Sequence, residues 1–319
     1  MGLKIALQMD PIEDVSVSAD STFRIGLEAE SRGHTLFQYT VDRLRYDEGQ
    51  IRAVGRSVTL RRDQGDHVTF GDWRDVDLAD FDVVCLRQDP PFDMGYITST
   101  HLLDRIKATT LVVNDPFWVR NCPEKLMVLD FPDLTPPTII ARDTDAIRAF
   151  RQRHGDIVVK PLYGNGGAGV FVLREGDANL ASLMETFAAM NREPVIAQKF
   201  LPEVVKGDKR IILVDGVVAG AINRVPAAGE ARSNMHVGGR PEKVGLTARE
   251  HEICARLAPV LREKGLLFTG IDVIGDWLTE INVTSPTGIQ ELERFDGVNA
   301  AQMIWEAVEQ RWSRDYAGR

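Results

Sequence analysis

The feature that most narrows the possible folds of this chain is a glycine-rich segment, Gly164-Asn165-Gly166-Gly167-Ala168-Gly169, set between two apolar runs. The segment spells GxGxxG, and in a dinucleotide-binding fold such glycines open a helix whose N-terminus receives the pyrophosphate. Here the following residues, Val170 to Leu173, are β-branched and aromatic and therefore favour a strand. A glycine loop between two strands indicates a flexible flap and argues against a nicotinamide-dependent dehydrogenase.

Two properties of this loop favour phosphate binding. Glycines leave the backbone amides free of side chains, so that these amides can approach a phosphate closely. Lys160 ends the preceding apolar strand, where its ammonium needs an anion to offset burial. The P-loop spelling GxxxxGK[ST] is absent. For the loop taken alone, an ordinary hairpin turn is the alternative interpretation.

Two carboxylates and an amide lie inside otherwise apolar runs nearer the C-terminus: Asp272 in one run, Glu280 and Asn282 in the next. Glu280 and Asn282 are two residues apart and share one face of a strand. Asp272 pairs with Glu280 if residues 275–277 form the loop, whereas a two-residue loop would move Asp272 to the opposite face. Neighbouring carboxylates need a proton or a cation between them, and this oxygen-only set suits Mg²⁺ held together with a phosphate. The alternative is an exposed sheet face that carries solvated acids.

Composition excludes several classes of protein. The chain has 319 residues, 44% of them apolar, and a net charge of −9, which disfavours nucleic-acid binding. Its three cysteines form no CxxC pair, so we expect neither a disulfide scaffold nor a zinc cluster. The N-terminus is too short and too soon polar for a signal peptide, and no run is long enough to span a membrane. These features predict a reduced, cytoplasmic setting and no membrane or nucleic-acid partner.

The pattern of runs predicts an α/β fold, and the length of the chain suggests two or three packed subdomains. Strands near 3–8, 34–40, 81–86 and 110–113 alternate with helices near 23–32 and 97–107, which indicates an open α/β sheet. Residues 41–75 are polar with only short β-type pieces, and a short helix is expected at 123–131. A hairpin turns at Asp215-Gly216, a long helix covers 248–264, and a last helix lies near 298–312. We place a first domain at about 1–120, and residues 226–242, which lack an apolar period, are expected to form a long loop.

Several motifs together resemble bacterial glutathione synthetases of the ATP-grasp superfamily. They are Asp89-Pro90-Pro91-Phe92-Asp93, Val158 to Leu162 with the glycine loop, Gly207-Asp208-Lys209-Arg210, and Thr279 to Gly288. The segment 229–240 is similar to the flexible lid loop of that family. The likeness covers nearly the whole chain. The lysine and carboxylate motifs are common to ATP-grasp enzymes, whereas the first and last motifs are more specific to this family.

The resemblance implies an ATP-grasp fold of three α/β parts in which ATP lies between two sheets. The expected boundaries are 1–122 for the N-terminal domain, 123–201 for a lid subdomain, and 202–319 for a C-terminal subdomain with a flexible loop at 226–242. The implied reaction joins γ-glutamylcysteine to glycine through an acyl phosphate, with Mg²⁺, or alternatively Mn²⁺, as the metal. Because an acyl phosphate must be kept from water, we expect loop 226–242 to be mobile without ligands. The resemblance also implies a homotetramer. One alternative is another ATP-grasp carboxylate–amine ligase. A second is an inactive nucleotide-binding protein, and the intact lysines and carboxylates argue against this second alternative.

The resemblance assigns roles to residues at matching positions. For ATP it implies Lys125, Lys160, the loop Gly164, Asn165, Gly166, Gly167 and Ala168, the hinge Gln198, Lys199, Phe200 and Leu201, and Asp208 near the ribose. For the metal it implies Asp272, Glu280 and Asn282. For the transferring phosphoryl group we expect Arg210, Arg224, Arg232 and Asn234. For Arg210 or Arg224 taken alone, a surface salt bridge is the more common role. For the peptide substrate the resemblance implies Arg87, Asp89, Ser285 and Thr287.

Overall fold

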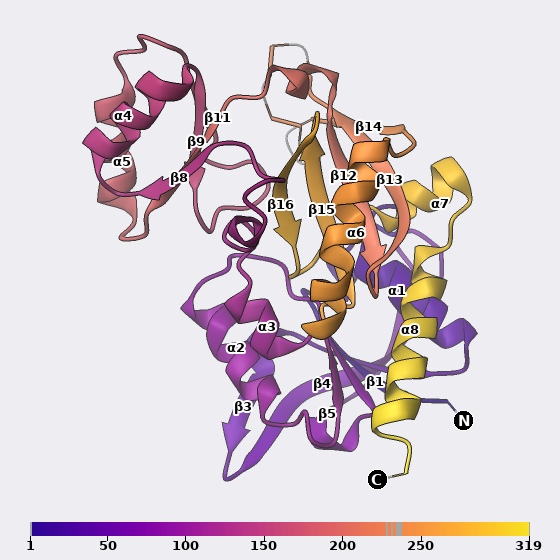
Figure 1. Cartoon of the computed structure of the whole chain (residues 1–319). Coiled ribbons are helices and arrows are strands. Elements are labelled where there is room, and N and C mark those ends of the chain that lie inside the picture. The colour runs from indigo at the N-terminus through magenta and orange to yellow at the C-terminus, as the bar shows by residue number, and fades with distance from the viewer. Residues whose placement is uncertain (1, 228, 231, 234–237, 319) are drawn as a thin grey trace.

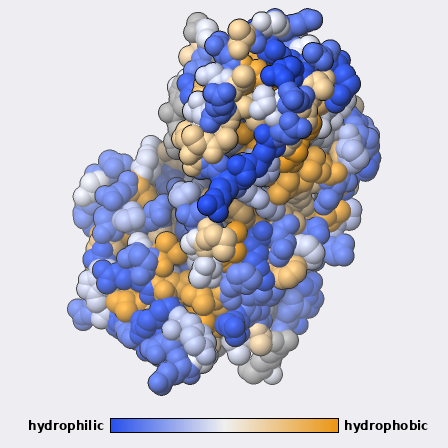
Figure 2. Space-filling view, turned by 90° about the vertical axis from the view of Figure 1, so that its left-hand side faces the viewer, coloured by the Kyte–Doolittle hydropathy of each residue, from blue (hydrophilic) through white to orange (hydrophobic). Residues whose placement is uncertain are grey.

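The structure, a computed structural model, describes residues 2–227, 229–230, 232–233 and 238–318. These residues form a seven-stranded, a four-stranded and a five-stranded sheet in chain order. The four-stranded sheet and its two helices project from the rest as a lid, and the other two sheets form a body (Figure 1). On the face shown in Figure 2 the upper lobe and the lower body are both largely covered by hydrophilic residues.

The N-terminal sheet has the order β3-β4-β2-β1-β6-β7, with β5 paired to β4. Its strands are β1 (Lys4–Gln8), β2 (Thr35–Tyr39), β3 (Leu44–Asp47), β4 (Gln50–Leu60), β5 (Val68–Asp77), β6 (Val83–Leu86) and β7 (Leu111–Val113). The neighbours β2, β1, β6 and β7 run parallel, and β1 is buried on both faces. Ile5 and Leu7 therefore face one hydrophobic cluster while Ala6 faces another, as the two-residue period of a strand requires.

Helices cover both faces of this sheet. They are α1 (Ser21–Ser31), α2 (Met94–Asp104) and α3 (Pro116–Asn121). The N-cap Asp20 starts α1 by accepting a hydrogen bond from Phe23 N at 2.6 Å. The buried Phe23 of α1 belongs to the cluster of Ile5, whereas Tyr96 of α2 belongs to the cluster of Ala6. The open α/β sheet expected for this part of the chain is confirmed.

One prediction for this domain is wrong. Residues 41–75 were expected to hold only short β-type pieces, but β4 is a continuous strand of 11 residues and β5 one of 10. Most of β5 is exposed, so its sequence lacks the apolar alternation of a half-buried strand. Hydrogen bonds to β4, from Arg52–Asp77 to Leu60–Val68, give β5 its extended form.

The lid holds β8 (Thr138–Ala141), β9 (Ile157–Pro161), β10 (Phe171–Leu173) and β11 (Val195–Lys199), in the order β10-β9-β11-β8. The helices α4 (Thr144–His154) and α5 (Leu180–Met190) pack on it through a cluster that includes Phe150 and Phe187. Among the described residues, none of the body belongs to this cluster. The strand β10 follows the glycine loop, so the prediction of a strand there is confirmed and a Rossmann-type helix is excluded.

The C-terminal sheet has the order β14-β13-β12-β15-β16. Its elements are β12 (Asp208–Val214), β13 (Val217–Val225), β14 (Arg240–Lys243), β15 (Phe268–Ile274), β16 (Trp277–Asn282), α6 (Ala248–Glu263), α7 (Ile289–Asp296) and α8 (Ala300–Asp315). The expected hairpin turns at Asp215-Gly216. Leu257 of α6 belongs to the cluster of Ile211, whereas Trp305 of α8 belongs to the cluster of Ile212, so helices cover both faces.

Three expectations for the second half of the chain need correction. The helix expected at 123–131 is a 3-10 turn, Met127–Asp130, and its segment lies along β16, where Ile281 N donates to Glu124 O at 3.1 Å. The helix α7 was not expected at all. The strand β14 occupies the end of the expected loop 226–242. Residues 228, 231 and 234–237 of that loop lie outside the described residues, so its mobility stays a prediction.

Candidate active site

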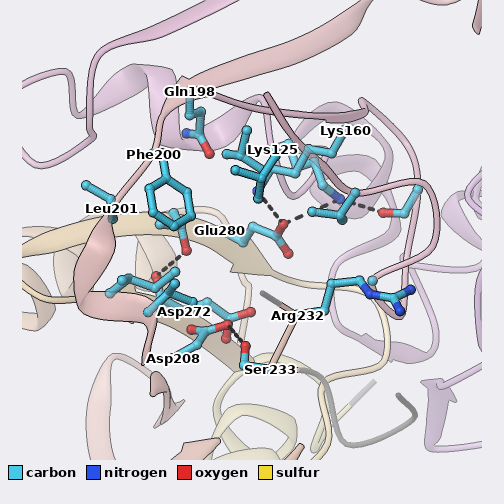
Figure 3. A pocket seen from close by; sticks show the side chains of 18 of the residues that line it. Lys125, Lys160, Gln198, Phe200, Leu201, Asp208, Arg232, Ser233, Asp272 and Glu280 are labelled. Carbon is cyan, nitrogen blue, oxygen red and sulfur yellow. Dashed lines mark hydrogen bonds and ion pairs between the residues drawn. The ribbon is translucent and has the colours of Figure 1, made fainter. Parts of the chain in front are cut away.

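A pocket with about 910 Å³ of open space, solvent at its mouth included, lies between the lid sheet and the C-terminal sheet. The lid contributes β9, β10, β11 and the glycine loop, and the body contributes β12, β15 and β16. At one end the walls are apolar, with Val158 and Val172 from the lid and Ile274 from the body. At the other end lie charged side chains and the loop Gly164 to Ala168 (Figure 3). The expected nucleotide-contacting residues from Lys125 to Asp208 all line this pocket.

The polar end is organised around one carboxylate. Lys160 Nζ lies 2.9 Å from Glu280 Oε1, and Lys125 Nζ lies 3.7 Å from the same oxygen. Lys125 also donates to Gly164 O, which ties the glycine loop to the body. Burial would raise the pKa of Glu280, but the ammonium groups of Lys125 and Lys160 outweigh burial and hold the pKa below its usual value. Two cations on one anion leave a net positive charge beneath the glycine loop (Figure 3).

The hairpin β15–β16 brings Asp272 directly opposite Glu280, but not by the expected route. The turn is the two-residue Gly275-Asp276, since Ile274 pairs with Trp277. A regular two-residue hairpin would put Thr279 opposite Asp272. A β-bulge at this point takes Thr279 out of register, and its hydroxyl donates to Asp272 O at 3.1 Å. The bulge therefore restores the pairing that a two-residue turn alone would have removed.

Asp272 belongs to a buried network with two arginines. Arg210 Nη2 donates to Asp272 Oδ2 at 3.0 Å, and Arg224 Nη2 lies 3.0 Å from the same oxygen. Arg224 Nη2 also lies 2.7 Å from Asp208 Oδ2, which accepts a further bond from Ser233 Oγ at 2.8 Å. Burial would raise the pKa of Asp272, but the two guanidinium groups hold it well below its usual value. For Asp208 burial prevails over Arg224 and raises the pKa.

The residues expected to bind the metal are close together and chemically suitable. Asp272 and Glu280 face each other across the hairpin, and Asn282 Nδ2 lies 3.4 Å from Asp272 Oδ2. The buried Asp208 Oδ1 has no hydrogen-bond partner in the described part of the chain. Among the described residues no group of three or more His, Cys, Asp or Glu side chains could hold a metal alone. Two carboxylates and an amide oxygen thus fit a hard cation that is shared with a phosphate.

The arginines expected at the transferring phosphoryl group have other partners in this structure. Arg210 and Arg224 bind the carboxylates of Asp272 and Asp208. Arg232 lines the pocket and pairs with Glu230 at 2.6 Å. Asn234 lies outside the described residues. Direct contact of these side chains with a phosphoryl group stays a prediction.

The residues expected on the peptide side gather at the junction of the two body sheets. Arg87 is buried, and its Nη2 donates to Pro286 O at 3.1 Å. Ser285 Oγ donates to Arg87 O at 3.3 Å. Thr287 is half-buried in the same loop, and Asp89 is exposed. The structure thus brings Arg87 and Ser285 into contact and places Asp89 on the surface beside them.

The sequence analysis missed Glu124. This half-buried residue precedes Lys125, and its Oε1 accepts a hydrogen bond from Thr284 Oγ1 at 2.7 Å. Burial raises the pKa of its carboxyl group, an effect that Lys125 opposes and Glu280 reinforces. Glu124 lies in a loop without periodicity, and no motif marks it, so only its position next to Lys125 could have drawn attention to it.

Comparison with known proteins shows which family this chain is similar to. Models for the N-terminal domain and for the ATP-grasp domain of prokaryotic glutathione synthetase match residues 3–120 and 124–297. The glutathione synthetase of Brucella melitensis is 58% identical over 98% of this chain and 100% of its own length. That of Yersinia pestis is 42% identical over 97% of this chain and 98% of its own length.

Solved structures of ATP-grasp proteins share the fold. D-cycloserine synthetase DcsG has a TM-score of 0.70 at 17% identity, over 97% of this chain and 99% of its own. An ATP-grasp RimK domain protein from Sphaerobacter thermophilus has a TM-score of 0.62 at 19% identity, over 95% of this chain and 98% of its own. The expected ATP-grasp fold is confirmed.

Proposed function

This chain belongs to the prokaryotic glutathione synthetase family, and we propose that the pocket between its lid and body carries out the ligation. The chain is an ATP-dependent ligase, a glutathione synthetase that joins γ-glutamylcysteine to glycine. The observation that carries the assignment of the pocket is the meeting of Lys125, Lys160 and Glu280 beneath the glycine loop. This arrangement offers positive charge to a triphosphate in a site shielded on two sides by sheets.

In our proposal the adenine base lies at the apolar end of the pocket. Val158, Val172 and Ile274 would enclose its faces. The hinge amides of Lys199 and Phe200 already donate to Pro137 O and Asp156 O, both at 2.9 Å. The amides of those two residues are thus already occupied, so we expect the amide of Leu201 to donate the hinge hydrogen bond to the adenine base. The triphosphate would run from there toward the two lysines and the glycine loop.

We propose that Asp272, Glu280 and Asn282 hold Mg²⁺, for which Mn²⁺ could substitute. When bound, the metal supplies positive charge to the phosphate oxygens. Arg210 and Arg224 position Asp272 by fixing its oxygens, and the bulge at Thr279 keeps Glu280 on the same face. Phosphate oxygens would compete with Glu280 for Lys160 and Lys125, which frees the carboxylate to act as a ligand.

The proposed chemistry has two steps. A cysteinyl carboxylate oxygen attacks the γ-phosphorus of ATP, the bond from that phosphorus to ADP breaks, and an acyl phosphate forms. The amine of glycine then attacks the acyl carbon, phosphate leaves with the bonding electrons, and the amine loses a proton. Lys125 and Lys160 stabilise negative charge on the phosphoryl group. The glycine loop excludes water, which would otherwise hydrolyse the acyl phosphate.

Isotope transfer tests this route. With ¹⁸O in the cysteinyl carboxylate of γ-glutamylcysteine, one labelled oxygen should pass to inorganic phosphate in each turnover, as measured by mass spectrometry. The reason is that the oxygen that attacks phosphorus stays on the phosphate when the amine displaces it. Phosphate without the label, or label in AMP, would contradict the acyl-phosphate route.

We further propose, on family resemblance, a cytoplasmic homotetramer. No helix in the described part of the chain is both long and apolar enough to cross a membrane. Light scattering coupled to size-exclusion chromatography should give a mass near four chains, and a monomer mass at micromolar concentration would contradict the tetramer.

A further inference from the structure

A pair of aromatic rings joins the lid to the N-terminal domain beside the active-site pocket. Phe92 lies between β6 and α2, and Tyr163 lies between β9 and the glycine loop. Their ring centroids are 5.9 Å apart and their planes differ by 26°, so the rings are stacked. Since α2 lies on the side of the body beneath the lid (Figure 1), this stack links two parts of the molecule that have separate hydrophobic cores.

The body holds Phe92 in a fixed position. Phe92 packs against the hydrophobic cluster of the body, and its ring centroid lies 5.2 Å from that of the buried Tyr96. The next residue, Asp93, starts α2 by accepting a hydrogen bond from Tyr96 N at 2.9 Å. Because both the core and the start of a helix fix this segment, Phe92 is the stationary member of the pair.

Tyr163 lies at the start of a segment whose own side chains offer few contacts that could hold it. Residues 164–169 are four glycines, one asparagine and one alanine. Tyr163 itself is 36% exposed, and the described residues that form the core of the lid do not include it. A role in folding the lid therefore does not explain a large ring at this position. Its stack with Phe92 instead ties the start of the glycine loop to the N-terminal domain.

The two rings also line a cavity next to the active-site pocket. This cavity has about 280 Å³ of open space, solvent at its mouth included. Lys125, Gly164 and Asn165 line both the cavity and the pocket, so the two spaces adjoin at the glycine loop. Phe92 is half-buried and Tyr163 is exposed. Water that passed between the two rings would therefore reach the phosphate end of the pocket.

Water at this place would destroy the intermediate of the proposed reaction, because the acyl phosphate must persist until glycine arrives. If the oxygen of a water molecule attacks the acyl carbon, the bond from that carbon to the phosphate oxygen breaks and phosphate leaves with the bonding electrons. The attacking water loses its protons to solvent, and γ-glutamylcysteine is regenerated with one oxygen from water. Each such event consumes ATP without forming glutathione.

We propose that Phe92 and Tyr163 are positioning residues whose stack holds the glycine loop against the N-terminal domain and closes the adjoining cavity to water. The inference rests on the proposed function and adds to it a contact that keeps the two chemical steps coupled. Neither ring carries a charge, so removing one should loosen the loop without removing the positive charge of Lys125 and Lys160. The expected defect is a loss of coupling between ATP use and glutathione formation.

Substitutions at the two rings test the proposal. Tyr163→Ala and Phe92→Ala each remove one ring, whereas Tyr163→Phe keeps the ring and lacks the hydroxyl group. Phe171→Ala is the matched control, because Phe171 is an exposed aromatic residue of the lid whose ring contacts Phe187 within the lid. ADP and glutathione are measured together at limiting glycine in ¹⁸O-labelled water. Mass spectrometry then records the label in the recovered γ-glutamylcysteine.

The wild type should form ADP and glutathione in equal amounts, with no label in the peptide. Tyr163→Ala should form more ADP than glutathione and place label in the peptide. It should also lower kcat/KM for ATP about two- to tenfold, the factor by which an aromatic pair shifts an equilibrium. Phe92→Ala should show the same defect, and the double variant should be no worse than the poorer single variant, because both remove one contact. Tyr163→Phe should restore coupling, and Phe171→Ala should behave as the wild type.

Equal amounts of ADP and glutathione in Tyr163→Ala would overturn the role of the stack while leaving the proposed reaction standing. A defect of the same size in Phe171→Ala would overturn it as well, because general loosening of the lid would then be the cause. Excess ADP without label in the peptide would also overturn it, since water would then hydrolyse ATP directly. Failure of the wild type to form glutathione would instead contradict the proposed function, and the role of the stack with it.

Discussion

At the scale of single residues, the pocket separates two kinds of charged group. Lys125 and Lys160 share one carboxylate, Glu280, as their salt-bridge partner among the described residues, so they keep positive charge for an incoming anion. Arg210 and Arg224 are matched by Asp272 and Asp208 inside the protein, so their charges are already balanced. We therefore expect the lysines to affect nucleotide binding most and the arginines to affect stability as well.

Replacing Lys160 should weaken the reaction with ATP. In Lys160→Ala we expect kcat/KM for ATP to fall about 10²- to 10³-fold, because a cation aimed at the transferring phosphate is lost. The control is Lys206→Ala, which removes an exposed lysine outside the pocket. Initial-rate kinetics over a range of ATP concentrations measure both. Similar losses in the two variants would contradict a specific role of Lys160.

Replacing Arg210 should destabilise the fold. In Arg210→Met the buried Asp272 keeps Arg224 as its one cationic partner among the described residues, and we expect the free energy of unfolding to fall by about 3 kcal/mol. Arg256→Met breaks an exposed ion pair with Asp133 and should leave the urea midpoint almost unchanged. Urea denaturation followed by circular dichroism measures the difference. A midpoint for Arg210→Met equal to that of Arg256→Met would rule out a strongly coupled buried pair.

The lowered pKa of Glu280 predicts a pH dependence with a definite sign. A carboxyl group whose pKa is lower in the folded than in the unfolded state stabilises the fold above the unfolded pKa, about 4.5. That stabilisation is lost as the pH falls through the folded pKa. The wild type should therefore be more stable than Glu280→Gln by a constant amount from pH 7 to pH 6, and this difference should shrink below pH 4.5. A difference that grows on acidification would show that the pKa is raised instead.

At the scale of elements, the hairpin and the glycine loop that form the site depend on different backbone features. The hairpin β15–β16 depends on a bulge, and the glycine loop depends on backbone conformations that few other residues adopt. Gly169 has φ of +68°, and a Cβ there would lie 2.9 Å from Pro161 Cγ. Since Pro161 follows Lys160, a change at Gly169 should move the lysine as well.

Gly169→Ala should therefore raise KM for ATP, by about tenfold, through displacement of the loop. Gly176→Ala is a matched control, because Gly176 also has a positive φ, +81°, lies on the lid, and has open space around its Cα. Both substitutions strain the backbone by about 1–2 kcal/mol. Only Gly169→Ala should change the ATP kinetics. An equal rise in KM for both variants would mean that strain anywhere in the lid, and not the loop itself, governs ATP binding.

Elements with a strong local signal could be predicted from the sequence. The turn at Asp215-Gly216, the strand after the glycine loop and the shared face of Glu280 and Asn282 follow from residue type and spacing. The strand β5 and the helix α7 could not be predicted, because contacts with other parts of the chain determine them. The residue types around Thr279 do not indicate a β-bulge. The sequence therefore predicted the pairing of Asp272 with Glu280 from a three-residue turn, whereas the structure reaches it with a two-residue turn and a bulge.

At the scale of the whole molecule, the packing divides lid from body. Ile211 and Ile271 of the C-terminal sheet share a cluster with Val84 and Val112 of the N-terminal sheet, so the body has a continuous core. The lid has its own core around Phe150 and is linked to the body across the pocket by Lys160–Glu280. The separate cores allow the lid to move as a unit, and a nucleotide that replaces this ion pair would connect lid and body in its place.

The central claim is that this pocket joins γ-glutamylcysteine to glycine at the expense of ATP. The most direct measurement is ADP release with ATP, Mg²⁺, γ-glutamylcysteine and glycine, with each component omitted in turn and the product identified by mass spectrometry. We predict that turnover requires all four and that the product is glutathione. Binding of ATP without turnover of this pair, or turnover that does not need glycine, would contradict the claim.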